Sequence, residues 1–257
     1  MRRFRFRTLC AIAHLVVFAT VVPVSAALSV PAPTPEVPKE MTFKGENNLV
    51  IEGLFYSAPQ TPAPTVILLN FRTRWSDWAP MWSTRGFNVV AIDLLIYNVG
   101  GSLDATIKQD VNDILLVMDQ LNSDPAVIPH QFALIGGSLM GGDALVTCSK
   151  APDCKTAILL SPTPTVESEY SEDPMVAMGN RPIMIVASRG EGIIADTARD
   201  YAKRARGYHL LLIYDWGFHA TAMFYAHPEL VDTVGDWLVT YLLNRRGSPL
   251  PPSSLVF

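Results

Sequence analysis

The chain of 257 residues has few charged residues, few cysteines and no long apolar run, and each shortage excludes a class of protein. Only 17% of the residues are charged and 49% are hydrophobic, which excludes a disordered chain. Three cysteines are too few for a disulfide scaffold. The net charge of −4 offers no basic surface for nucleic acid. No apolar run reaches the roughly 20 residues that a membrane-spanning helix needs.

The first 26 residues have the pattern of a secretory signal peptide. Four arginines lie within the first seven residues, and an apolar run from Leu9 to Val22 follows. Val24-Ser25-Ala26 then supplies the small residues typical of a cleavage site. We therefore predict export to the periplasm or the medium with removal of residues 1–26. An uncleaved membrane anchor is the alternative.

Cleavage would change both the charge and the cysteine count. The 20 basic residues would fall to 16 against 24 acidic ones, for a net charge of −8. Such a surface favours neither nucleic acid nor a stable association with a membrane. Cys10 would be lost, which leaves Cys148 and Cys154. An even pair in an exported chain suggests a disulfide between the end of a helix and the loop that leaves it. Two free thiols are the alternative.

The remainder of the chain divides into three parts. Residues 27–40 are rich in proline and predict a linker, and residues 247–257 predict a flexible tail. Between them, at 41–246, short apolar runs alternate with helical patterns, and several runs lack polar alternation. This pattern predicts an α/β fold: a doubly wound, mostly parallel sheet with helices on both faces. The predicted strands are Leu49–Tyr56, Thr65–Asn70, Phe87–Asp93, Phe132–Gly136, Thr156–Ser161, Pro182–Ala187 and Tyr208–Tyr214.

Three helices have distinct signals. An apolar stripe at helical spacing predicts a helix from near Leu103 to Leu121. Asp196 is typical of the N-cap of a helix that runs to about Arg206, where Gly207 would end it. Pro228 suits the first turn of a final helix that ends near residue 245. In such a fold, ligand chemistry lies at the carboxyl ends of the strands.

A serine stands at one of these strand ends. The apolar run that ends at Gly136-Gly137 leads directly into Ser138 and a helical pattern. This resembles the nucleophile elbow of α/β-hydrolases, in which a tight strand–turn–helix presents a serine above the sheet. The resemblance implies that the Leu139 N–H serves the oxyanion hole. The family pattern G-x-S-x-G has glycine where this chain has Met140. A glycine-rich turn with a buried serine cap is the structural alternative.

The family order Ser, acid, His then points to two partners. Glu191 follows the sixth predicted strand, and His219 lies in the loop after the last one. The resemblance implies that Glu191 orients the imidazole, a role that Asp commonly fills in these relatives. Asp196 is the rival acid, and Asp215 is the residue that would only fix the loop.

Other histidines and the second oxyanion donor follow from the same order. His227 is the rival base, while His130 and His209 lie at strand beginnings and are expected to be structural. The second donor is expected from the loop after Leu69, as the backbone N–H of Phe71 or Arg72. Three tryptophans follow at positions 75, 78 and 82, and we expect them to pack in the core rather than to form a wall for substrate.

Residues 41–246 thus resemble the α/β-hydrolase superfamily, and most of all its small dienelactone hydrolase-like members. Only residues 162–181 separate two predicted strands where larger relatives insert a lid, so no lid domain is expected. The resemblance implies an exported serine hydrolase that cleaves carboxylic esters or thioesters of small molecules. It implies no cofactor and no metal. A non-catalytic binding protein on the same fold and an acyltransferase are the alternatives.

Overall fold

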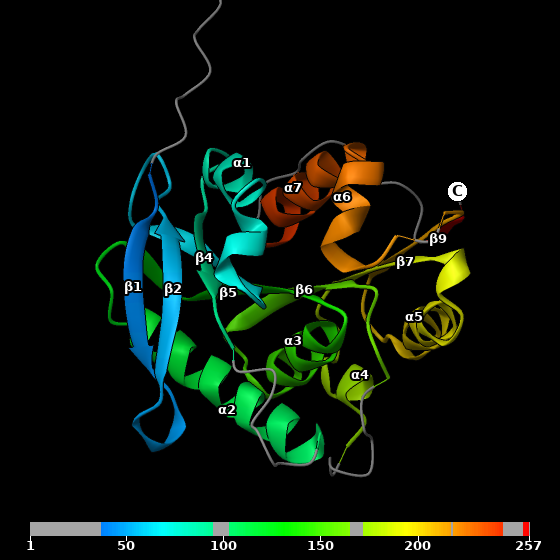
Figure 1. Ribbon diagram of the computed structural model, residues 1–257, viewed down its shortest axis with the longest axis horizontal. Helices are drawn as coiled ribbons and strands as arrows, with labels where there is room; N and C mark the ends of the chain where they lie inside the picture. Colours follow the sequence, from blue (N-terminus) through cyan, green and yellow to red (C-terminus); the bar gives the residue numbers. More distant parts are fainter. Residues whose placement is uncertain (1–36, 95–102, 165–171, 217, 244–253, 257) are drawn as a thin grey trace, which may run out of the picture. The chain divides into compact units, whose positions relative to one another are not determined.

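A single twisted sheet organises the molecule, for which the computed structural model describes residues 37–94, 103–164, 172–216, 218–243 and 254–256. The predicted signal peptide lies outside these ranges, as does most of the linker. Within them the sheet has nine strands in the order β1-β2-β4-β3-β5-β6-β7-β8-β9 (Figure 1). Their bounds are β1 Lys39–Lys44, β2 Val50–Tyr56, β3 Ala63–Leu69, β4 Asn88–Ile92, β5 Val127–Gly137, β6 Cys154–Leu160, β7 Ile183–Ser188, β8 His209–Tyr214 and β9 Ser254–Val256.

All seven predicted strands are present, and the predicted fold class is confirmed. β1 and β2 form an antiparallel hairpin, β2 pairs antiparallel with β4, and every later pairing is parallel. The linker boundary was wrong by two residues, because Lys39 and Glu40 pair with Phe55 and Leu54 at the start of β1. β5 also begins earlier than predicted, at Val127.

Two layers of helices cover the sheet, which explains the continuous apolar runs of its strands. One face packs against α2 (Leu103–Leu121), α3 (Leu139–Lys150), α4 (Pro174–Ala177) and α5 (Ile193–Arg204). The other face packs against α1 (Ala79–Ser83), α6 (Met223–Ala226) and α7 (Glu229–Tyr241) (Figure 1). Because successive strand residues point to opposite faces, a strand covered on both sides has no place for polar alternation.

Two helix boundaries differ from the predictions. Asp196 is not an N-cap, because α5 begins three residues earlier, after Gly192. The positive φ of 59° at Gly192 lets the chain turn straight from the preceding loop into the helix. The final helix ends at Tyr241, earlier than residue 245. Pro228 lies at its start as predicted, in the N-cap position.

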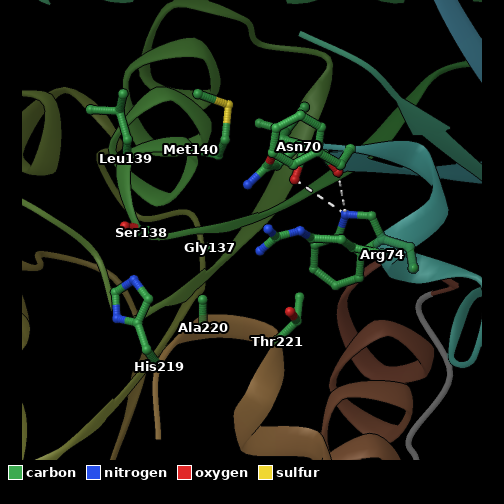
Figure 2. A pocket seen from close by; sticks show the side chains of 12 residues that line it. Asn70, Arg74, Gly137, Ser138, Leu139, Met140, His219, Ala220 and Thr221 are labelled. Atoms are coloured by element: carbon green, nitrogen blue, oxygen red, sulfur yellow. Dashed lines mark hydrogen bonds between the residues drawn. The ribbon is translucent and has the colours of Figure 1, made fainter. Parts of the chain in front are cut away.

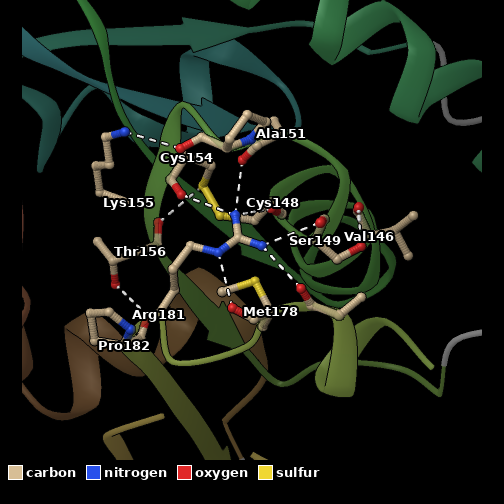
Figure 3. Close-up of a disulfide and its surroundings, with 12 residues drawn as sticks. Val146, Cys148, Ser149, Ala151, Cys154, Lys155, Thr156, Met178, Arg181 and Pro182 are labelled. Atoms are coloured by element: carbon tan, nitrogen blue, oxygen red, sulfur yellow. Dashed lines mark hydrogen bonds between the residues drawn. A yellow bond between two sulfur atoms is a disulfide. The ribbon is translucent and has the colours of Figure 1, made fainter. Parts of the chain in front are cut away.

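The predicted disulfide joins Cys148 in α3 to Cys154 at the start of β6, with Cα atoms 5.1 Å apart. The half-buried guanidinium of Arg181 lies beside it and donates to backbone carbonyls of both cysteines and of Ala151 (Figure 3). These carbonyls include the final ones of α3, which lack partners within the helix. Disulfide and arginine together fasten the turn between α3 and β6.

The prediction of a flexible tail over 247–257 is wrong at residues 254–256, and the rest of that tail lies outside the described residues. Ser254–Val256 form β9, which pairs in parallel with Leu211–Ile213 of β8. The outer edge of β8 has backbone groups that need partners, and an apolar extended segment can supply them.

The segment between β6 and β7 is where a lid would be inserted. Its described part contains α4, a helix of four residues. None of the helices in the described ranges combines the length and apolar character that a membrane span requires.

Candidate active site

A cavity of about 250 Å³ opens at the carboxyl ends of the central strands. Residues from three places in the sequence meet there: the loop after β3, the β5–α3 turn and the loop after β8 (Figure 2). The prediction that ligand chemistry lies at this edge agrees with where the cavity is found. Its lining consists of Leu69, Asn70, Phe71, Arg74, Trp75, Gly137, Ser138, Leu139, Met140, His219, Ala220 and Thr221.

Ser138 occupies a sharp strand-to-helix turn. Its φ of 59° and ψ of −125° are strained for a residue with a side chain, and α3 begins at the next residue. The turn is so tight that a Cβ on Gly136 would lie 2.0 Å from the carbonyl oxygen of Met140. Met140 occupies the position of the last glycine in the family pattern. Its side chain fits there, since it is 1% exposed and packs in the core. The close approach therefore demands glycine at 136, before the serine, and tolerates a side chain at 140.

The acid and base of the sequence prediction are in contact. His219 Nδ1 lies 2.7 Å from Glu191 Oε1, while the histidine side chain is half exposed and the glutamate side chain is 7% exposed. The imidazole of His219 is directed toward Ser138 across the cavity (Figure 2). An imidazole fixed at Nδ1 by a carboxylate has its Nε2 available to a hydroxyl.

Glu191 is held as a carboxylate by its neighbours. Its Oε2 accepts hydrogen bonds from the backbone N–H of Ser188, at 2.7 Å, and from the Ser161 hydroxyl, at 3.0 Å. Burial acts to raise the pKa of Glu191, but the hydrogen bonds from His219, Ser188 and Ser161 outweigh it and lower that pKa. An ionised acid next to the base can stabilise a positive charge that develops on His219.

The structure separates the two candidate oxyanion donors after β3. The Arg72 N–H donates to Asp93 Oδ1, so it is already occupied. Among the described residues, the N–H groups of Phe71 and Leu139 have no such partner. Trp75 holds the loop from behind, because its indole N–H donates to the backbone oxygens of Asn70, at 2.9 Å, and Leu69, at 3.2 Å.

The rival residues lie elsewhere. Asp196 is exposed and pairs with Arg199 on α5, and Asp215 pairs with Arg189. The ring of His227 stacks on Tyr214 with centroids 3.8 Å apart. His130 pairs with Asp153 at the start of β5, and His209 begins β8. Of these five predicted carboxylates and imidazoles, none lines the cavity.

The tryptophans pack in the core as expected. Trp75, Trp78 and Trp82 are each at most 5% exposed and pack together with Phe224 of α6. They do not share one helix, since Trp75 ends a 3-10 turn (Arg72–Trp75) and Trp82 lies in α1. Trp75 also lines the cavity, so it serves both the core and the site.

Sequence reasoning missed three polar contributors. The exposed Arg74 has no carboxylate partner among the described residues, and its guanidinium reaches into the cavity (Figure 2). Ser161 and Ser188 are fully buried behind Glu191. Ser188 does belong to a local motif, since it forms a Ser-x-x-Glu capping box with Glu191. No local motif marks Ser161, because its partners Glu191 and Ala220 lie 30 and 59 residues away along the chain.

Backbone strain concentrates around this cavity. Eight non-glycine residues of the described ranges have positive φ, and five of them lie in or beside the site. Such conformations cost about 1–3 kcal/mol each and persist where the surroundings determine them. The five are Asn70, Phe71, Ser138, Ser161 and Ala220.

Metal chemistry has no donor set in the part of the chain that the structure describes. No group of three His, Cys, Asp or Glu side chains lies close enough there to hold an ion.

Comparisons with known proteins rest on structure alone. No family model and no curated protein matches the sequence. A dienelactone hydrolase from Anabaena variabilis superposes with a TM-score of 0.66 at 15% identity, over 80% of this chain and 100% of that one. The chain has the α/β-hydrolase fold. An esterase from Thermogutta terrifontis superposes with a TM-score of 0.64 at 14% identity, over 84% of this chain and 98% of that one. An esterase from Pyrococcus furiosus reaches 0.61 at 16% identity, over 80% and 91%.

The predicted resemblance to dienelactone hydrolase-like members of this fold is consistent with these neighbours. The site described above lies where the α/β-hydrolase fold exposes a nucleophile at the sheet edge. At these identities the comparisons establish the fold, and the chemistry must be argued from the residues.

Proposed function

We propose that this protein is an exported serine hydrolase that cleaves esters or thioesters of small molecules. The observation that carries the proposal is the Glu191–His219 hydrogen bond at a cavity that also contains Ser138. An ionised acid, an imidazole and a strained serine at a helix N-terminus are the components of acyl transfer. The names of the structural neighbours, a dienelactone hydrolase and esterases, agree with this class.

The proposed reaction has two halves. Ser138 Oγ attacks the carbonyl carbon while His219 Nε2 accepts the hydroxyl proton. The carbonyl oxygen becomes an oxyanion, which the N–H groups of Phe71 and Leu139 stabilise. His219 then gives the proton to the leaving alcohol or thiol, and an acyl-serine remains. Water repeats the sequence on the acyl-serine and releases the acid and the free hydroxyl.

The lining also favours a class of substrate. Arg74 supplies a positive charge to the cavity, and no described carboxylate neutralises it. A substrate with a negatively charged group could pair with the Arg74 guanidinium through charge-assisted hydrogen bonds. The cavity volume of about 250 Å³ suits substrates with short acyl groups.

Covalent labelling tests the proposed chemistry. A fluorophosphonate should attach to Ser138 in the purified protein, and Ser138→Ala should abolish attachment. Ser83→Ala is a matched control, because Ser83 is a buried serine away from the cavity whose hydroxyl donates to Pro80 O within α1. Absence of labelling in the unaltered protein would favour a binding protein on this fold. Product analysis with and without an added alcohol separates hydrolysis from acyl transfer.

Export has its own test. The protein recovered from the periplasm or medium is expected to begin at or near Ala27. Recovery of intact Met1 in a membrane fraction would replace the signal peptide with an anchor.

A further inference from the structure

One buried hydroxyl touches both the acid and the loop of the base. Ser161 follows β6 directly and is 0% exposed. Its Oγ donates to Glu191 Oε2 at 3.0 Å and accepts from the N–H of Ala220 at 2.9 Å. Because Ala220 is the residue after His219, Ser161 spans from the acid to the backbone that carries the base.

The same contact continues to the nucleophile. Ala220 packs against Gly137 so closely that a Cβ on Gly137 would lie 2.8 Å from the Ala220 Cβ. Gly137 immediately precedes Ser138. Ala220 therefore contacts both the Ser161 hydroxyl and Gly137 of the turn that carries Ser138. These two contacts fix the position of the His219 loop relative to the serine.

Glutamate needs such support more than aspartate does. Its side chain has one more rotatable bond, so a hydrogen bond to one oxygen leaves the carboxylate free to swing. Here His219 takes Oε1, while Ser161 and the Ser188 N–H hold Oε2. The Ser188 hydroxyl also donates to Phe218 O at 2.8 Å, on the other flank of His219. With both oxygens held, Oε1 stays directed at the imidazole.

We propose that Ser161 is a positioning residue of this site, which keeps Glu191 and His219 in register with Ser138. This inference rests on the proposed function. Ser161 does not line the cavity, so it acts through the acid and the base rather than on substrate.

The test variant is Ser161→Gly. Ser161 has a φ of 49°, which glycine adopts readily, so the variant removes the hydroxyl without disturbing the backbone. With p-nitrophenyl acetate as the probe, kcat should fall about 10- to 100-fold while KM changes little, as expected for a lost hydrogen bond to a charged group. The downfield NMR signal of the His219 Nδ1 proton should weaken as well.

Thr156→Val is the matched control. Thr156 is equally buried, and its hydroxyl also makes two hydrogen bonds, to Pro182 O and from the Trp237 indole, away from the cavity. It should lose stability without a comparable change in kcat. Equal losses of kcat in Thr156→Val and Ser161→Gly would mean that any buried hydroxyl matters, and would overturn the proposal.

A double-variant cycle decides whether Ser161 acts through the acid. If it does, Ser161→Gly should slow Glu191→Gln little further, because the carboxylate it holds is already gone. Independent, multiplying losses would overturn the proposal, and so would a normal kcat in Ser161→Gly. Fluorophosphonate labelling distinguishes failure of the positioning role from failure of the proposed function. A labelled protein with independent losses retains its proposed function without the positioning role, whereas an unlabelled protein loses both.

Discussion

Glu191 and Asp143 are both carboxyl groups removed from water, yet their surroundings differ in kind. Glu191 has three donors around its two oxygens. Asp143, on α3, is 0% exposed, and neither of its oxygens has a hydrogen-bond partner among the described residues. Burial, with the charge of Asp110 on α2, raises the pKa of Asp143 well above its usual value. The pKa of Glu191 is lowered instead.

At Glu191 the donors outweigh burial, whereas at Asp143 burial acts without a donor among the described residues. The lowered pKa of Glu191 favours an anion suited to hold an imidazolium, whereas burial and the charge of Asp110 favour the protonated form of Asp143. A third carboxyl group, Asp110, has a pKa that burial and then the charge of Asp113 raise to about 7. The shifts therefore favour a charge at the candidate site and disfavour one at the α2–α3 interface.

The largest expected effect removes the charge at Glu191. Glu191→Gln keeps the shape but cannot stabilise a positive imidazole, and it disturbs the tautomer of His219. Ester turnover should fall by about 10⁴-fold, as in serine proteases that lose their acid. Steady-state kinetics with a folded, circular-dichroism-checked variant provides the measurement. Near-normal turnover would show that the charge of Glu191 is not used.

The second prediction concerns Asp110. Its folded pKa of about 7 lies above the unfolded value of 3.8. Between these values the unfolded chain releases a proton that the folded chain keeps, so stability falls as pH rises from about 4 to about 7. The loss is on the order of 4 kcal/mol at 1.36 kcal/mol per pKa unit. Asp110→Asn should flatten this fall in urea titrations at pH 5 and pH 8. An equal fall in both proteins would contradict the assignment.

The third prediction extends the contrast to cations. Arg181 is half-buried and bonded to carbonyls, whereas Arg74 contacts the Phe71 ring at the cavity and has no carboxylate partner among the described residues. Arg74→Ala should lower kcat/KM for a carboxylate-bearing ester about 10- to 100-fold, the range for a hydrogen bond to a charged group. A neutral ester of the same size should lose little. Equal losses on both esters would mean that Arg74 stabilises the loop after β3 and does not bind the substrate.

The smallest expected effect is at Asp196, the rival acid that lies five residues after Glu191 in the sequence. It is exposed, and among the described residues its ion-pair partner is Arg199 at 2.9 Å. Surface pairs contribute about 0–1 kcal/mol, so Asp196→Asn should leave turnover and melting temperature nearly unchanged. A large loss of turnover would transfer the role of acid from Glu191 to Asp196.

The sequence was informative wherever a pattern was local. Continuous apolar runs predicted the seven strands, since a strand covered on both faces needs no polar residues. Gly136-Gly137-Ser138 marked the turn, because only glycine at 136 permits the approach of the Met140 carbonyl. Chain order then pointed to Glu191 and His219. Position alone could not choose between Glu191 and Asp196, which are five residues apart.

What the sequence by itself determined is the order of strands and helices along the chain and the sheet edge at which the cavity lies, while the residues that react there stay its prediction. The tertiary structure alone decided which groups meet. Ser161 and Ala220 are 59 residues apart, and Asp110 and Asp143 lie on different helices. The Arg72 N–H was taken by Asp93, 21 residues away. Hydrogen-bond partners and pKa values depend on distances of a few ångströms, which arise from packing between remote segments and leave no periodic trace in the chain.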